Sequence, residues 1–294
     1  EVRDAGAELW HPWRVASLGR DDAGRFVITR QHTDDKGRYL DNDDPDTIVA
    51  ERVILATGGK ALPRTGSDGA GYAFAKAMGH SVTDRVFPSL VPILLGDQAS
   101  HLTELSGIAS VATLEVRSGT GKKLKEFTNS TLLTHFGLSG PGALDISRYF
   151  FDARHHDPDT ALVINWLPGE SFESVDKLLL SLGKRSIYNW LKQERQFPER
   201  LVRMLCDQAK VDANAPASTL TRDQRRELVR VLTDMPLPVT GDRGFTYAEV
   251  TAGGVPLDEI DLKTMESRVQ PGLHLIGEIC DVDGRIGGFN FQWA

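Results

Sequence analysis

Two carboxylates and a group of glycines lie close together near the end of the chain. Glu278 and Asp281 follow a short apolar run that predicts a buried strand, and Gly287 and Gly288 precede a predicted helix start at Asn290. In α/β sheets, ligands bind beyond the carboxyl ends of the strands, where an ionised carboxylate can accept a strong hydrogen bond from a ribityl hydroxyl. Paired glycines let backbone N–H groups approach a flavin ring closely. The run therefore indicates either part of a flavin site or an ordinary glycine-rich turn with solvated acids.

A second run of this kind stands near the start of the chain, where Val53-Ile54-Leu55 leads into Ala56, Thr57, Gly58 and Gly59. A continuous Val-Ile-Leu run predicts a parallel strand that is buried on both faces. The two glycines permit a sharp exit from that strand and the close approach of a bulky group. We therefore expect the two buried strands to belong to one α/β domain.

Other reactive side chains give weaker signals. His135 could shuttle protons beside a flavin or could hydrogen-bond loop backbone, and it is the only catalytic candidate that we name. Cys280 lacks the second cysteine of a Cys-x-x-Cys pair, which favours packing over redox chemistry. Tyr247 and Glu249 could face a cofactor or solvent. No histidine, cysteine and carboxylate spacing indicates a metal site.

The elements that must position these residues follow from patterning. Short apolar runs over residues 1–50 predict a β-meander, and a helix is expected over 70–78 with Gly79 closing it. Proline-bounded and alternating runs from Phe87 predict a β-rich unit with a short helix over 142–150. Amphipathic runs over 171–234 predict helices, and Pro236 and Pro238 mark a linker. About 150 residues thus separate the two buried strands, and so long an insertion should fold on its own.

The composition excludes several classes of protein. The net charge of −7 argues against a nucleic-acid partner, and no apolar run approaches the ~18 residues of a membrane span. Two cysteines cannot form a disulfide framework, so we expect a cytoplasmic protein. The chain begins with Glu1 rather than Met and ends on a predicted first helical turn, so we expect a fragment or trimmed chain. Oligomeric state is not predicted.

Six stretches, in this order, resemble the BaiN/YhiN-type FAD-dependent oxidoreductases, a family that includes aminoacetone oxidase-like flavoproteins. The resemblance covers nearly the whole chain and is weakest in the helical part. The stretches are Ala56-Thr57-Gly58-Gly59 with Gly71-Tyr72, Pro88-Ser89-Leu90-Val91-Pro92, Leu133 to Pro141, Thr251-Ala252-Gly253-Gly254-Val255, Lys263-Thr264-Met265-Glu266-Ser267 and Gly277 to Trp293.

The resemblance implies an α/β fold, namely a partial Rossmann-type FAD-binding domain with an inserted β-rich unit and a helical subdomain. The FAD-binding domain would comprise residues 1–84 and 242–294, the β-rich substrate domain 85–170, and the helical subdomain with its linker 171–241. The cofactor is FAD, with NAD(P)H open as electron donor. The FAD-binding residues implied are Ala56, Thr57, Gly58, Gly59, Gly277, Glu278, Asp281, Gly287, Gly288, Phe289 and Asn290.

One family feature is missing from this chain. The glycine-rich turn that holds the pyrophosphate of FAD is not found, because Gly66, Gly69 and Gly71 have the wrong spacing and follow no suitable strand. We therefore expect the first βαβ unit to be absent. The predicted function is hydride transfer between FAD and a small organic substrate. The alternatives are a fumarate-reductase-like flavoprotein and a folded, non-catalytic domain without bound flavin.

Overall fold

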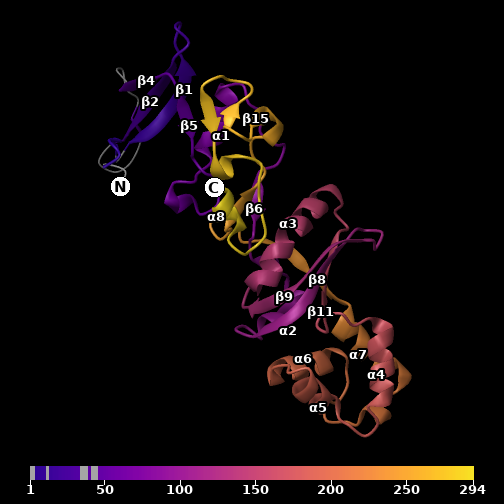
Figure 1. Cartoon of the computed structure of the whole chain (residues 1–294). Helices are drawn as coiled ribbons and strands as arrows, with labels where there is room; N and C mark the ends of the chain where they lie inside the picture. Colours follow the sequence, from indigo (N-terminus) through magenta and orange to yellow (C-terminus); the bar gives the residue numbers. More distant parts are fainter. Residues whose placement is uncertain (1–3, 11–12, 34–38, 41–45) are drawn as a thin grey trace. The chain divides into compact units, whose positions relative to one another are not determined.

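A computed structural model describes residues 4–10, 13–33, 39–40 and 46–294 (Figure 1). The chain forms two compact units. Unit 1 consists of Glu1–Val86, Ala252–Asp283 and Trp293–Ala294, and unit 2 consists of Phe87–Thr251 and Gly284–Gln292. The predicted β-rich and helical segments thus fall in one unit, together with most of the last predicted helix. The division into an FAD-binding, a substrate and a helical part stays a prediction.

The first sheet of unit 1 is the expected meander. Its strands are β1 (Arg14–Arg20), β2 (Phe26–Thr33), β3 (Tyr39–Leu40) and β4 (Thr47–Ala50), and β2 pairs antiparallel with the other three. The ring of Phe26 is fully buried, and Leu18 is buried with it in the core of unit 1. The meander thereby shares a core with the second sheet of the unit.

The second sheet carries both predicted ligand-binding strands. Its order is β15 (Ile260–Asp261), β16 (Glu266–Ser267), β17 (Leu273–Leu275) and β5 (Val53–Leu55). Strands β17 and β5 are parallel neighbours in this sheet, and both lie in unit 1. The prediction that β5 is buried on both faces is wrong, because Ile54 is 62% exposed while Leu55 is buried. Only one face of this edge strand packs on the described core.

Helix α1 (Ala70–Ala77) follows β5 and closely matches the predicted helix. The carboxylate of Asp68 accepts a hydrogen bond from the backbone N–H of Ala70, which satisfies one of the free donors at the helix start. Tyr72 and Ala75 point into the core of unit 1. The helix therefore covers the sheet beside the end of β5.

Unit 2 is built on a seven-stranded antiparallel sheet. Its order is β12 (Met235–Leu237), β11 (Ala161–Asn165), β8 (Ala109–Arg117), β9 (Lys123–Thr134), β10 (Gly137–Ser139), β7 (Ile93–Leu95) and β13 (Val239–Asp242). Pro238 alone joins the two edge strands, so the sheet curls until its edges approach each other. The prediction of a linker here is wrong. Pro236 is tolerated because it lies on an edge strand, where a missing N–H costs least.

Helices pack on this sheet and share its core. Helix α3 (Gly140–His156) contacts β8 and β9, and it buries Ile146 and Phe150. The other described α-helices of unit 2 are α2 (Ser100–Thr103), α4 (Phe172–Ser181), α5 (Ile187–Asn189), α6 (Glu199–Gln208) and α7 (Arg222–Thr233). Helix α8 (Phe289–Trp293) also belongs to unit 2, except for its last residue, Trp293, which belongs to unit 1. A short ladder of β6 (Phe87–Ser89) and β14 (Val250–Ala252) completes the strands.

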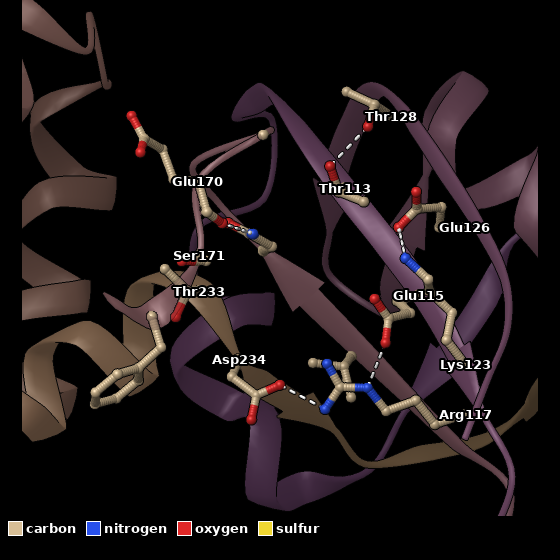
Figure 2. A pocket seen from close by; sticks show the side chains of 14 residues that line it. Thr113, Glu115, Arg117, Lys123, Glu126, Thr128, Glu170, Ser171, Thr233 and Asp234 are labelled. Atoms are coloured by element: carbon tan, nitrogen blue, oxygen red, sulfur yellow. Dashed lines mark hydrogen bonds and ion pairs between the residues drawn. The ribbon is translucent and has the colours of Figure 1, made fainter. Parts of the chain in front are cut away.

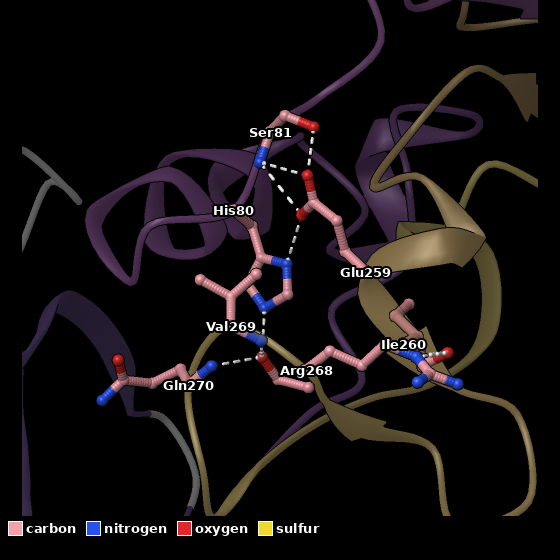
Figure 3. Close-up of polar contacts among 8 residues, drawn as sticks. His80, Ser81, Glu259, Ile260, Arg268, Val269 and Gln270 are labelled. Carbon is pink, nitrogen blue, oxygen red and sulfur yellow. Dashed lines mark hydrogen bonds and ion pairs between the residues drawn. The ribbon is translucent and has the colours of Figure 1, made fainter.

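A buried histidine ties the end of α1 to the second sheet (Figure 3). The Nδ1 atom of His80 lies 2.6 Å from a carboxylate oxygen of Glu259, and its Nε2 atom lies 2.7 Å from the hydroxyl of Ser267. The geometry resembles a catalytic triad. However, Ser267 is buried and its oxygen already accepts backbone N–H bonds from Val269 and Gln270, so the network is structural.

Replacing Glu259 with Gln should lower the free energy of unfolding at neutral pH by about 1 kcal/mol. Burial acts to raise the pKa of Glu259, but hydrogen bonds from Ser81 and His80 outweigh it and hold the pKa below its ordinary value. A lowered folded-state pKa adds stability above the unfolded pKa and loses it as the pH falls through the folded value. Urea unfolding of the wild type and of Glu259→Gln should therefore give different free energies of unfolding at neutral pH and similar ones at acidic pH. A constant difference across pH would contradict this account.

Candidate functional site

The carboxyl ends of β5 and β17 bring together the two runs that the sequence predicts. Because the strands are parallel neighbours, their ends meet at one edge of the sheet. The backbone N–H of Gly59 lies 3.4 Å from a carboxylate oxygen of Glu278, although 219 residues separate them in sequence. Ala56, Thr57 and Gly58 thus lie beside the turn that begins at Gly277.

Glycines shape both sides of this junction. Gly58 and Gly277 adopt left-handed conformations, with φ of +69° and +73°, which other residues rarely adopt. A Cβ atom on Gly58 would collide with the side chain of Ser67, and one on Gly71 would collide with Thr57. The chain after β5 is therefore folded tightly against the start of α1, and Thr57 packs directly on that helix.

The stretch Thr251-Ala252-Gly253-Gly254-Val255 supports the turn that carries Glu278 and Asp281. Val255 donates a backbone hydrogen bond to Ile279 and accepts one from Asp281, at 2.9 and 2.8 Å. A Cβ on Gly254 would lie 2.6 to 2.8 Å from backbone atoms of Ile279 and Cys280. The glycine is required because two backbones run in contact here. It holds Glu278 and Asp281 in a defined turn after β17.

A buried hydroxyl without a partner lies in the same unit. The Oη atom of Tyr72 is shielded from solvent and makes no hydrogen bond to any residue that the structure describes. Burial, and then the negative charge of Glu278, raise the pKa of this hydroxyl, so it stays protonated and can act as a donor. An unpaired buried hydroxyl costs about 1–3 kcal/mol, which makes it a candidate for binding a polar ligand atom. Sequence reasoning assigned Tyr72 no role beyond its place in a motif.

Cys280 belongs to the core rather than to the reactive part of the turn. Its side chain is fully buried, and burial raises the pKa of the thiol to about 11. Its Sγ atom lies 3.7 Å from the carbonyl oxygen of Leu275. The prediction that this residue serves packing agrees with its position.

The remaining predicted cofactor residues lie in unit 2. Gly287 and Gly288 have φ of +132° and +85° and lead into the five-residue helix α8. The side chain of Asn290 bonds the backbone N–H and C=O of Gly284, at 2.7 and 3.0 Å, while Phe289 is 58% exposed. Asn290 therefore closes the glycine loop, and the role of all four residues in binding FAD stays a prediction.

The weaker candidates also lie in unit 2. His135 and Phe136 form the two-residue turn between β9 and β10, with His135 exposed and its ring edge-on to Phe136 at 5.1 Å. Tyr247 and Glu249 are exposed in the segment that follows β13. The catalytic role of His135 stays a prediction.

A polar cavity of about 570 Å³ opens on the sheet of unit 2, between β8, β9, β11 and the start of α4 (Figure 2). Most of its charged groups pair with one another, while Glu170 pairs with Arg195, which is not part of the lining. Arg117 bridges Glu115 and Asp234, and Lys123 lies 3.0 Å from Glu126. The cavity contains none of the residues predicted to bind FAD, and its internal pairing gives no reason to assign it a catalytic role.

The residues at the ends of β5 and β17 fit part of a flavin. Glu278 and Asp281 carry carboxylates, a type of group that accepts hydrogen bonds from hydroxyls, the glycines leave the backbone accessible, and Tyr72 carries a protonated hydroxyl donor. Among the described residues, no group of three or more His, Cys, Asp or Glu side chains is arranged to hold a metal ion. No helix in the described part of the chain has the length and apolarity to cross a membrane.

Comparison with curated proteins finds relatives with two different names. The chain is 33% identical over 253 residues to a 3-dehydro-bile acid delta(4,6)-reductase of Clostridium scindens, an alignment that covers 85% of this chain and 61% of the relative. It is 35% identical over 250 residues to a ribosomal RNA dihydrouridine synthase of Escherichia coli, covering 84% and 59%. A synthase of the same name from Haemophilus influenzae is 33% identical over 268 residues, covering 91% and 63%.

The chain thus spans roughly three fifths of the length of these relatives, from 59% to 63%. The family model described as the HI0933-like protein Rossmann domain matches residues 21–294. That match includes both glycine runs and the turn with Glu278 and Asp281. The chain therefore belongs to the HI0933-like Rossmann-domain family, which includes the BaiN/YhiN-type FAD-dependent oxidoreductases that its motifs resemble.

Proposed function

We propose that this chain is part of an FAD-dependent oxidoreductase that adds hydrogen to a C=C bond conjugated with a ketone or amide carbonyl group. The observation that carries the proposal is the junction of Gly59 and Glu278 at the ends of the parallel strands β5 and β17. Ligands of α/β proteins bind at such an edge. The family membership and the reductase named among the relatives support a flavin enzyme.

The chain's own residues would hold and orient the cofactor. Glu278 and Asp281 would accept hydrogen bonds from ribityl hydroxyls, and Tyr72 would donate its buried proton to an acceptor on the cofactor. Thr57 to Gly59 would let the cofactor approach the backbone at the end of β5. When bound, FAD supplies hydride transfer, and the protein supplies orientation and exclusion of water.

The substrate is the open part of this proposal. Dihydrouridine differs from uridine by saturation of one ring C=C bond conjugated with a carbonyl, so the names of both kinds of relative describe hydrogen addition to the same type of bond. A small-molecule substrate, a cytoplasmic location and NAD(P)H as donor remain our proposals. The relatives named for ribosomal RNA make RNA the competing substrate class. The net charge of −7 favours the small molecule.

A titration with FAD tests the proposal directly. The purified chain should bind FAD, shown by quenching of flavin fluorescence and by a shift of the visible flavin spectrum. The bound flavin is then reduced without oxygen, and a conjugated enone should reoxidise it while fumarate should not. Reoxidation by fumarate would instead support the fumarate-reductase-like alternative. A folded chain that leaves the flavin spectrum unchanged would support the remaining alternative, a domain without bound flavin.

Changing Asp281 to Ala should weaken FAD binding about tenfold, because a carboxylate acceptor for the ribityl chain is lost. The measurement is the dissociation constant of FAD by fluorescence quenching. Asp258→Ala is the matched control, since Asp258 is an exposed carboxylate in the same unit. Equal affinity of the Asp281 variant and the control would remove Asp281 from the site.

A further inference from the structure

The guanidinium of Arg243 in unit 2 contacts two aromatic rings. Its guanidinium carbon lies 3.5 Å from the ring centre of Tyr247 and 4.4 Å from that of Phe136. An arginine in this arrangement is fixed by stacking and cation–π attraction, while the edge of its planar fork stays available for hydrogen bonds. Sequence patterning gave no sign of Arg243.

The fold brings these three residues together from separate segments. Phe136 lies in the turn between β9 and β10, while Arg243 follows β13 and Tyr247 lies in the next turn. Strands β10 and β13 both pair with β7, one on each side of it. The arrangement is therefore set by the sheet and not by a flexible side chain alone.

The guanidinium of Arg243 differs from several other guanidinium groups of unit 2. Arg117, Arg195 and Arg225 each pair with a carboxylate at 3.0 Å or less. Arg243 makes no side-chain hydrogen bond or ion pair with any residue described by the structure, and its side-chain partners there are the two rings. A preformed, partly buried guanidinium without an anion suits bidentate recognition of a carboxylate or phosphate.

We propose that Arg243 binds the oxyanion of a ring-bearing ligand, a carboxylate or a phosphate, whose ring lies against the exposed surface of Tyr247. Tyr247 is 49% exposed, which leaves room for such a contact. Arg243 provides two parallel N–H donors to the oxyanion, and its contacts with Tyr247 and Phe136 hold the guanidinium in place. This site concerns ligand recognition, and it does not rest on the proposed flavin chemistry.

The test is calorimetric titration of the full chain, without flavin, with three probes. Uridine 5′-monophosphate carries a phosphate, cholate carries a carboxylate on a fused ring system, and uridine is the neutral counterpart of the first. The wild type should bind at least one oxyanion probe about tenfold or more tightly than uridine. Because flavin is absent, a failure here and a failure of the proposed reductase activity are distinguishable.

Changing Arg243 to Gln should remove this preference, and Arg243→Lys should restore only part of it, because lysine keeps the charge but loses the planar fork. Arg226→Gln is the matched control, since among the residues that the structure describes Arg226 lies over a single ring, that of Phe172 at 5.5 Å. If Arg243→Gln loses affinity only for uridine 5′-monophosphate, the ligand is a phosphate. If it loses affinity only for cholate, the ligand is a carboxylate. The proposal is overturned if the wild type shows no oxyanion preference, or if Arg243→Gln and Arg243→Lys, both with wild-type urea midpoints, keep it.

Discussion

Changing Gly254 to Ala is expected to destabilise unit 1 by about 3 kcal/mol, because the new methyl group has no space. Its Cβ would lie 2.6 Å from the carbonyl oxygen of Ile279 and 2.7 to 2.8 Å from backbone atoms of Cys280. Backbone atoms cannot rotate away as a flexible side chain would. Relief therefore requires the segment around Gly254 to separate from the turn after β17.

That separation would break a specific set of hydrogen bonds. Thr83 bonds Gly254 at both its N–H and its C=O, at 2.9 Å each, and Val255 bonds Ile279 and Asp281 on the other side. The same contacts fix the turn that carries the predicted ribityl acceptors. Gly254→Ala should therefore weaken FAD binding as well as stability, although the residue has no predicted contact with the cofactor.

Urea unfolding followed by tryptophan fluorescence and far-ultraviolet circular dichroism measures the first effect. Gly19→Ala is the matched control, since Gly19 lies in β1 of the same unit, has an ordinary φ, and has no atom within 4 Å of the position that a methyl group would take. The control should change stability by less than about 0.5 kcal/mol. Equal stability of the two variants would show that the contact around Gly254 is looser than the structure indicates.

Local sequence signals predicted several elements of the fold and the character of its larger segments. The alternating runs after Phe87 predicted a β-rich unit, and β8 (Ala109–Arg117) lies in it, with Ala112, Leu114 and Val116 buried on one face. Helix α1 was placed correctly because Gly79 and the turn before Ala70 mark its two ends. Such signals depend on neighbours in sequence, which is why they are visible before the fold is known.

Features that depend on distant segments were missed. Pro236 and Pro238 indicated a linker, because sequence alone does not reveal an edge position where a strand tolerates proline. Val53-Ile54-Leu55 predicted burial on both faces, but which faces are covered depends on elements elsewhere in the chain. In both cases the residue pattern indicated the local backbone preference correctly. It did not show which other segments pack against the residues.

The candidate site could likewise be predicted only in part. Glycines and carboxylates at strand ends indicated Gly59 and Glu278, and their junction across 219 residues agrees with that interpretation. The unpaired hydroxyl of Tyr72 and the stacked guanidinium of Arg243 gave no signal, because each is defined by what surrounds it. Buried polar groups without partners become visible only when the packing is known.

Changing Tyr72 to Phe is expected to have opposite effects on stability and on FAD binding. The protein without cofactor should gain about 1–3 kcal/mol of unfolding free energy, because a buried donor that lacks a partner is removed while the ring is kept. FAD binding should weaken about tenfold if the hydroxyl donates to the cofactor. A substitution that acts only through stability would not raise the free energy of unfolding while lowering the affinity for FAD.

Urea unfolding of the cofactor-free chain and fluorescence titration with FAD measure the two effects on the same preparations. Tyr149→Phe is the matched control, because Tyr149 lies partly exposed on α3 in the other unit, and it should change neither quantity. A gain in stability with unchanged FAD affinity would assign the Tyr72 hydroxyl to packing alone. A loss of stability would mean that the hydroxyl has a partner in solution. A gain in stability together with a loss of FAD affinity would place a cofactor atom at the end of the Tyr72 side chain, beside the turn of Glu278 and Asp281.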